Sequence, residues 1–245
     1  MKNVINKLTN YKKELEAINE ELTTLPEGYL LKRKKFYWQV INGKEIGITK
    51  SPKIIQQLCR KKYLLVRQKQ LTHNFSTPLN QLNKLDNRTP SEIIQEFSKA
   101  YQGLPKKYFF HPSIEPWLSK VHKMNPYPIE SIYHTKNGIQ LRSKSELLIA
   151  NLLEEYEIPY KYDIAFALGE KTIYPDFQIK NLFTGKFIIW EHFGALNQPS
   201  YEQQMHSKME GYTKRGYIPF ETLIYTFEFD IDSSRLQSLI ENVIL

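Results

Sequence analysis

The sequence has one cysteine, Cys59, so an internal disulfide is excluded, and this scarcity is typical of a reducing compartment. It also lacks any apolar run near the roughly 18 residues that a membrane-spanning helix needs. The first residues contain no continuous apolar stretch of the signal-peptide kind. We therefore expect a cytoplasmic protein with no membrane partner. Apolar residues still make up 41% of the chain, which is enough for a packed core and excludes wholesale disorder.

The charge is distributed unevenly along the chain. Residues 1–140 contain 24 Lys and Arg against 11 Asp and Glu, a net charge of +13. Residues 141–245 contain 10 against 15, a net charge of −5. Such asymmetry indicates a basic part that meets a polyanion and an acidic part with another role. A merely solvated basic face is the alternative.

Residues 1–103 are expected to form a basic α+β region. Apolar residues at steps of three and four predict helices over 3–22 and 52–69. Between them, the turn pair Asn42-Gly43 joins two strand-like runs, 29–41 and 45–49, and predicts a β-hairpin. Thr89-Pro90-Ser91-Glu92 predicts the capped start of a further helix.

Two basic clusters in this region predict contacts with nucleic acid. One lies directly before Phe36-Tyr37-Trp38 and consists of Lys32, Arg33, Lys34 and Lys35; the other consists of Arg60, Lys61 and Lys62. Basic side chains bind phosphates and aromatic side chains stack on bases, so their combination is typical of nucleic-acid surfaces. For the first cluster, an edge strand kept soluble by lysines is an equally good interpretation.

The middle of the chain is rich in proline. Five of them, Pro105, Pro112, Pro116, Pro126 and Pro128, exclude a long helix there. We predict that residues 104–131 connect the basic region to a C-terminal domain, 132–245.

The most informative stretch runs from Thr172 to Gly194. Two runs rich in β-branched and aromatic residues flank a six-residue turn containing Asn181 and Gly185, which predicts a hairpin. In a regular hairpin about this turn, Asp176 lies directly opposite Glu191. Like charges there are destabilising, and a divalent cation between the carboxylates is the simplest reason to keep them.

The elements around this hairpin predict an α/β domain. We expect a strand pair over 132–141, a helix over 143–156, a strand over 160–168, the hairpin, a helix over 199–215, a strand over 222–227 and a final helix over 233–244. The core order is therefore α-β-β-β-α-β.

With Pro175-Asp176 and Glu191 on successive strands, this order resembles the PD-(D/E)XK phosphodiesterase superfamily, which has the restriction-endonuclease-like fold. The stretches Arg-Ser-Lys-Ser-Glu (142–146), Tyr-Pro-Asp-Phe (174–177) and Trp-Glu-His-Phe-Gly (190–194) resemble nuclease-like proteins of bacterial genomes and mobile elements. The resemblance covers about residues 132–245. It implies a metal-dependent endonuclease that hydrolyses phosphodiesters, with Mg²⁺ (or Mn²⁺) held by Asp176, Glu191 and Glu146.

The chain departs from the superfamily at one position. The superfamily's lysine comes two residues after the acidic residue, where this chain has Phe193. In some branches the following helix supplies the lysine, and Lys208 is the best-placed candidate for it. His192 could replace it only through a bulge, because a regular strand points His192 away from Glu191.

Other interpretations of these residues stay open. Ser143 and Glu146 form a capping-box pattern that explains Glu146 without catalysis. His192 fits a packing or hydrogen-bonding role, and Lys208 could be a solvated lysine. A non-catalytic nucleic-acid-binding or assembly protein with a degenerate nuclease fold is therefore the alternative function. We expect DNA in preference to RNA as the partner; strandedness, sequence specificity and a homodimer are left open.

Overall fold

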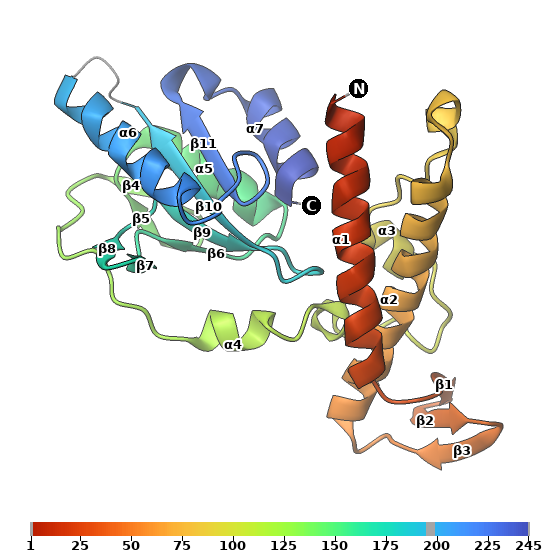
Figure 1. The fold of residues 1–245 in the computed structure, drawn as a ribbon. Helices are drawn as coiled ribbons and strands as arrows, with labels where there is room; N and C mark the ends of the chain where they lie inside the picture. Colours follow the sequence, from red (N-terminus) through yellow and green to blue (C-terminus); the bar gives the residue numbers. More distant parts are fainter. Residues whose placement is uncertain (1, 195–198, 245) are drawn as a thin grey trace. The chain divides into compact units, whose positions relative to one another are not determined.

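The computed structural model describes residues 2–194 and 199–244, and the chain divides into two compact units, residues 1–111 (unit 1) and residues 112–245 (unit 2) (Figure 1). Both units mix helices and strands, so the predicted α/β class is confirmed at that level. Among the described residues, no helix combines the length and apolar character needed to cross a membrane.

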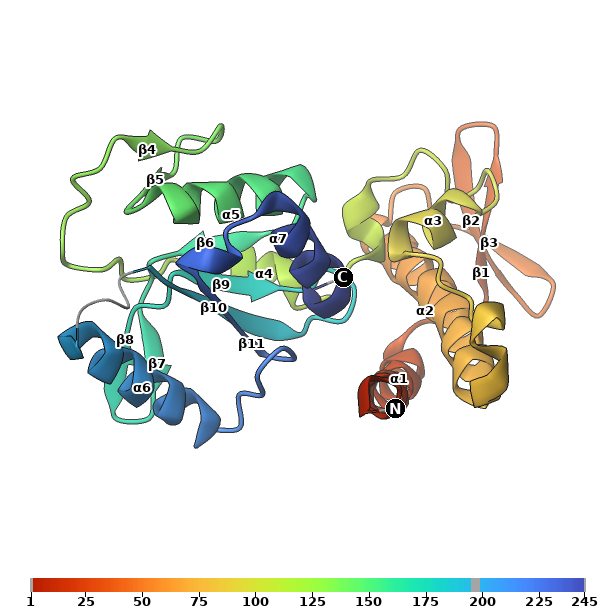
Figure 2. The same cartoon turned by 90° about the horizontal axis from the view of Figure 1, so that it is seen from above.

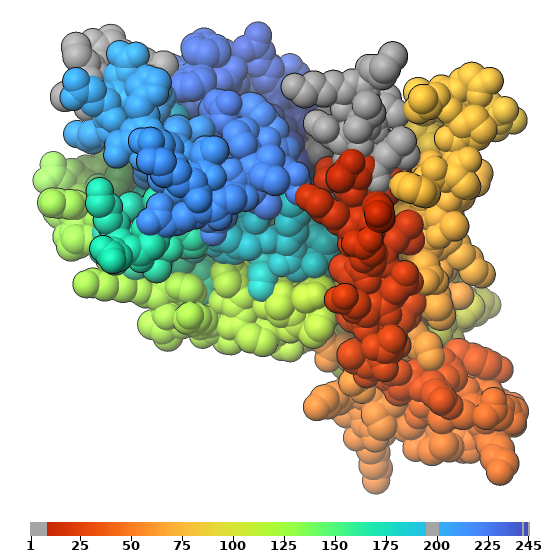
Figure 3. All heavy atoms as spheres, viewed as in Figure 1, coloured from red at the N-terminus to blue at the C-terminus, as the bar shows by residue number. Residues whose placement is uncertain are grey.

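Unit 1 is built on two long helices that pack side by side (Figures 1 and 2). Its elements are α1 (Lys2–Thr24), β1 (Tyr29–Arg33), β2 (Phe36–Ile41), β3 (Lys44–Gly47), α2 (Pro52–Ser76), η1 (Leu79–Lys84), α3 (Pro90–Gln95) and η2 (Lys106–Phe109). The three strands form an antiparallel sheet in the order β1-β2-β3, which projects from the surface of the unit (Figure 3).

The prediction of a single strand over 29–41 is wrong. A turn at Lys34 and Lys35 divides it into β1 and β2, and Lys34 has a φ of 54°. The predicted Asn42-Gly43 turn is confirmed, with φ values of 48° and 77°. These positive values are what a tight hairpin turn of this kind requires.

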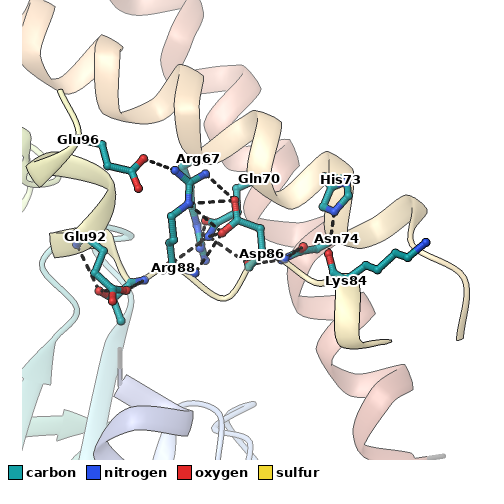
Figure 4. A network of polar contacts seen from close by, with 10 residues as sticks. Arg67, Gln70, His73, Asn74, Lys84, Asp86, Arg88, Glu92 and Glu96 are labelled. Carbon is teal, nitrogen blue, oxygen red and sulfur yellow. Dashed lines mark hydrogen bonds and ion pairs between the residues drawn. The ribbon is translucent and has the colours of Figure 1, made fainter. Parts of the chain in front are cut away.

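Helix α2 continues seven residues beyond its predicted end, because its last turns bind the following loop. Asn74 donates to the carbonyl oxygen of Asp86 (2.8 Å) and accepts from the Asp86 main-chain N–H (2.7 Å). Gln70 donates to the carbonyl oxygen of Arg88 (2.8 Å), and the Arg88 guanidinium pairs with the Asp86 carboxylate (2.5 Å). This network, drawn in Figure 4, ties the loop to the helix ahead of α3. The capping box predicted for Thr89 and Glu92 is confirmed.

The boundary between the two units lies within the connection that the sequence predicts over 104–131. Phe109 is buried in unit 1, and its carbonyl oxygen accepts from Arg60 (3.0 Å). Ile114 is buried in unit 2, and the neighbouring Ser113 accepts from Lys180 (2.8 Å). The segment is therefore shared between the two units at His111 and Pro112.

Unit 2 is organised around a four-stranded mixed sheet with the order β11-β10-β9-β6. Strand β9 runs antiparallel to both of its neighbours, β6 and β10, and β11 runs parallel to β10. The elements of the unit are α4 (Ile114–Ser119), β4 (Tyr133–His134), β5 (Gln140–Leu141), α5 (Lys144–Glu155), β6 (Tyr160–Tyr162), β7 (Phe166–Leu168), β8 (Lys171–Ile173), β9 (Phe177–Lys180), β10 (Phe187–Phe193), α6 (Pro199–Thr213), β11 (Leu223–Phe227), η3 (Glu228–Asp230), α7 (Ser233–Leu239) and η4 (Ile240–Ile244).

Helices cover both faces of this sheet, α5 and α7 on one side and α6 on the other (Figure 2). Side chains alternate along a strand, so each strand contributes to two cores. Trp190, Ile179 and Ile224 pack towards α5 and α7, while Ile189 and Leu223 pack with Tyr212 of α6. The face towards α6 carries Glu191.

The prediction of one continuous strand over 160–168 is wrong. It breaks at Asp163, whose φ is 50°, and its second half, β7, pairs with β8 in a separate hairpin. The Asp163 carboxylate is held there by Arg142 (2.8 Å) and Asn125 (2.8 Å). These long-range contacts stabilise a backbone conformation that the local pattern does not indicate.

Candidate active site

Asp176 lies opposite Glu191, as the sequence had predicted. The β9–β10 ladder ends with the pair Phe177 and Trp190, so Asp176 and Glu191 are the next residue on each side, and Glu191 is close enough to raise the pKa of Asp176. The turn sets this register, because the side-chain oxygen of Asn181 accepts from the main-chain N–H groups of Phe183 (2.9 Å) and Thr184 (2.7 Å). The sheet thus presents two carboxylates on the face towards α6.

Asp176 is half-buried, and its carboxylate accepts a hydrogen bond from the main-chain N–H of His192 (2.6 Å). Burial and the neighbouring Glu191 raise the pKa of Asp176 well above its ordinary value. The Lys208 ammonium acts in the opposite direction, as does the hydrogen bond from His192. Asp176 therefore keeps its proton to higher pH than an exposed aspartate.

Glu191 is fully buried and has a donor on each carboxylate oxygen. Lys208 lies 2.6 Å from Oε2, and the Tyr212 hydroxyl donates to Oε1 over 2.5 Å. Burial lowers the pKa of Lys208, but Glu191 and Asp176 outweigh it, so that the net shift is upwards and the ammonium stays charged. Burial and Glu191 raise the pKa of Tyr212, which keeps it a neutral donor.

Helix α6 supplies these two donors from one face, because Lys208 and Tyr212 lie four residues apart. Tyr201 lies on the same face, and its ring packs edge-on against Phe193 with centroids 6.5 Å apart. Gln204 of the same helix is exposed. Phe193 occupies the position of the superfamily's lysine and is buried against Tyr201 and Phe227.

Glu146 is buried at the start of α5, where it completes the predicted capping box with Ser143. Its Oε2 atom also accepts from Tyr162 (2.6 Å) and from the main-chain N–H of Arg142 (3.0 Å). It lies close enough to raise the pKa of Asp176. Its role as a metal ligand stays a prediction.

His192 points to the opposite face of the sheet from Glu191. Its ring nitrogens lie 3.2 Å from the Thr226 hydroxyl and 3.1 Å from the Glu228 carboxylate, which also accepts from Ser145 (3.1 Å). The side chain has the hydrogen-bonding role expected on a regular strand, and β10 has no bulge that turns it into the site. Its contribution to the site is the main-chain N–H that holds Asp176.

The carboxylate pair suits Mg²⁺ by the kind of donor it offers. Within residues 2–194 and 199–244, no group of three or more His, Cys, Asp or Glu side chains is arranged to hold a metal ion. Mg²⁺, however, is commonly bound by one or two carboxylates that water and substrate phosphates complete. Asp176 and Glu191 fit that pattern, although Lys208 and Tyr212 engage Glu191 in this structure.

The two basic clusters of unit 1 differ in their surroundings. Arg33, Lys34 and Lys35 are exposed and Lys32 is half-buried at the β1–β2 turn, although Arg33 pairs with Glu45 (2.6 Å). This cluster remains a predicted nucleic-acid contact.

The second cluster needs correction at Arg60. Arg60 is buried, with both terminal donors engaged by Glu21 (2.8 Å) and Phe109, so it is not accessible to a phosphate. Lys61 donates to the carbonyl oxygen of Pro26 (2.8 Å), and Lys62 lies over the Phe97 ring. These side chains hold neighbouring segments against α2.

Sequence reasoning missed two tyrosines that orient the acidic residues, Tyr212 on Glu191 and Tyr162 on Glu146. Tyr212 lies four residues after Lys208, and this spacing is the signal that could have identified it. No sequence pattern indicated Tyr162, because its hydrogen bond to Glu146 depends on where the short strand β6 ends.

Comparison with known proteins gives little beyond this geometry. No family model matches the chain, and no solved structure matches it. The chain is similar to Uncharacterized protein MJ1519 of Methanocaldococcus jannaschii, with 31% identity over 84 residues, or 34% of this chain. The matched stretch covers 7% of the length of that relative.

Proposed function

We propose that unit 2 is a metal-dependent nuclease that hydrolyses phosphodiester bonds of nucleic acid, DNA in preference to RNA. The observation that carries the proposal is the opposed pair Asp176 and Glu191 with the Lys208 ammonium 2.6 Å from Glu191. The order α5, β6, β9, β10, α6, β11 also agrees with the core that the resemblance to PD-(D/E)XK phosphodiesterases implies, with β7 and β8 as an inserted hairpin.

Each residue has a defined task in this proposal. Asp176 and Glu191 would hold the metal ion, with Glu146 close enough to act on Asp176 electrostatically. When bound, Mg²⁺ or Mn²⁺ supplies an activated water and neutralises charge on the phosphate. Lys208 transfers its hydrogen bond from Glu191 to the scissile phosphate, which its flexible stem allows. Tyr212 keeps Glu191 oriented meanwhile.

A cleavage assay tests the proposal. Labelled single-stranded DNA, duplex DNA and RNA are each incubated with the protein in Mg²⁺, Mn²⁺ or EDTA. We expect cleavage of at least one substrate with a divalent ion, none in EDTA, and loss of cleavage in Asp176→Asn and Glu191→Gln. Glu170→Gln, which changes an exposed carboxylate in the β7–β8 turn, is the matched control. Undiminished cleavage in both site variants would refute the assignment.

One observation favours a second candidate, a nucleic-acid-binding protein with a degenerate nuclease site. Both oxygens of Glu191 already have donors, so Lys208 balances the charge that a metal ion would otherwise balance. In this alternative the protein binds nucleic acid in EDTA and Mg²⁺ equally well. Titration with Mn²⁺ in the absence of substrate separates the two, because the nuclease predicts a divalent ion bound in a way that depends on Asp176.

A further inference from the structure

A group of basic side chains in unit 2 lies outside the carboxylate site and was not part of either predicted cluster. Lys161 of β6 donates to the main-chain carbonyl oxygen of Lys120 (2.7 Å), and its ammonium lies 5.4 Å from the centre of the Trp117 ring. Lys120 and the nearby Lys123 are exposed. The ring and the carbonyl oxygen hold the Lys161 ammonium in one place.

Several basic groups lie close enough around Lys161 to repel one another. Burial lowers the pKa of His122, and Lys161 and Lys120 lower it further. Burial and Lys120 also lower the pKa of Lys161. Within the described part of the chain, the buried Nε2 atom of His122 has no hydrogen-bond partner. An anion that reached the group would relieve the repulsion and could accept from that atom.

The sheet connects this group to the candidate active site. Gln178 of β9 pairs with both Lys161 of β6 and Ile189 of β10, and alternation along β10 places Glu191 on the same face as Ile189. The side chain of Lys161 therefore leaves the sheet on the face that carries the carboxylates.

A second connection runs through main-chain hydrogen bonds. The Ala165 N–H donates to the carbonyl oxygen of Lys123 (2.8 Å), and the Asn125 N–H donates to that of Asp163 (3.1 Å). The Asp163 N–H in turn donates to the carbonyl oxygen of Asp176 (3.1 Å). The basic segment is thus fixed to the backbone that positions Asp176.

We propose that Lys120, Lys123 and Lys161, with His122, form a subsite for a backbone phosphate of the nucleic-acid strand, next to the carboxylate pair. The subsite holds a phosphate other than the one that is cleaved, and so fixes the register of the strand across Asp176 and Glu191. This inference rests on the proposed function for the identity of the anion. Its physical basis, the clustered cations, is separate from the carboxylates.

The test measures binding without cleavage. Affinity for a fluorescent single-stranded DNA, its duplex and an RNA of the same sequence is measured in EDTA over a series of salt concentrations. The double variant Lys120→Gln/Lys123→Gln removes two exposed charges, while the main-chain oxygens that bind Lys161 and Ala165 remain. Lys161→Gln is measured separately, with its thermal unfolding as a check on folding.

A plot of the logarithm of the binding constant against the logarithm of the salt concentration has a negative slope. The magnitude of this slope should decrease by about 0.7–0.9 for each phosphate that the variant no longer neutralises. We expect such a reduction in Lys161→Gln and in the double variant. Lys214→Gln changes a lysine paired with Glu210 and should leave the slope as in the wild type. An unchanged slope in the double variant, or an equal reduction in Lys214→Gln, would overturn the subsite. Because metal is absent, a reduced slope in a protein that cleaves nothing would support the subsite and refute the nuclease.

Discussion

At the scale of single residues, the charge balance of the candidate site depends on Lys208. The hairpin alone brings two carboxylates together, and Lys208 offsets their repulsion by pairing with Glu191. The two carboxylates are therefore not equivalent. Glu191 has a cationic partner. Asp176 instead accepts a hydrogen bond from a main-chain N–H, and the charge of Glu191 raises its pKa.

This difference predicts opposite effects on stability. In EDTA, Glu191→Gln should lower the free energy of unfolding by about 1–3 kcal/mol, because it leaves the Lys208 charge without its partner. Asp176→Asn should leave stability unchanged or raise it, since it removes a like charge and keeps an acceptor for His192. Urea unfolding measures both. Equal stabilisation by the two variants would mean that repulsion between carboxylates dominates and that the Lys208 pair contributes nothing.

Tyr212 tests the orientation of Glu191. Tyr212→Phe removes only the hydroxyl that donates to Oε1, so it should lower the free energy of unfolding by about 0.5–1.5 kcal/mol. It should also raise the Mg²⁺ concentration needed for half-maximal cleavage. Tyr217→Phe is the control, because the Tyr217 ring packs edge-on against Tyr212 at 5.7 Å. Equal effects in both variants would show that the loss does not come from the hydrogen bond to Glu191.

The raised pKa of Asp176 predicts how stability depends on pH. The folded state binds this proton more tightly than the unfolded state, whose carboxyl has a pKa near the ordinary 3.8. The resulting stabilisation is therefore fully present below that value and is lost as the pH rises through the folded pKa. Denaturant unfolding of the wild type and Asp176→Asn in EDTA measures it. Parallel pH profiles for the two proteins would show that Asp176 is not the titrating group.

At the scale of elements, local sequence was sufficient where caps and turns act within a few residues. Ser143 and Glu146 cap α5, Asn42-Gly43 turns β2 into β3, and Asn181 sets the register that brings Asp176 opposite Glu191. Each of these signals is a hydrogen bond or a φ preference between near neighbours. The proximity of the two carboxylates could therefore be predicted without a structure, whereas Lys208 was a candidate only because of the resemblance to PD-(D/E)XK phosphodiesterases.

Elements shaped by distant contacts could not be predicted in this way. The break between β6 and β7 at Asp163 depends on Arg142 and Asn125, which lie far away in the sequence. Arg60 carries the same local signal as an exposed lysine, but Glu21 of α1 buries it. A pattern of apolar and charged residues does not identify the partner of a charge across helices.

At the scale of the whole molecule, the basic residues of unit 1 divide into internal and external charges, and the two sets should behave differently. Lys34→Gln/Lys35→Gln should flatten the salt dependence of nucleic-acid binding by about 0.7–0.9 for each phosphate that is no longer neutralised and leave stability unchanged. Arg60→Met should lower the free energy of unfolding by about 3–5 kcal/mol, because it leaves Glu21 without its partner, and keep the salt slope. Anisotropy titrations and urea unfolding measure the two quantities. A reversal of the two results would contradict the division.

The central claim, a metal-dependent nuclease whose α6 lysine assists the carboxylates, is tested most directly by single-turnover cleavage in saturating Mg²⁺. Wild type, Glu191→Gln, Lys208→Ala and His192→Ala are compared on one substrate. We expect no cleavage by Glu191→Gln and a loss of roughly 10²–10³ in rate for Lys208→Ala, the usual cost of one preorganised donor, with a milder loss for His192→Ala. A near-normal rate for Lys208→Ala together with collapse in His192→Ala would contradict the account.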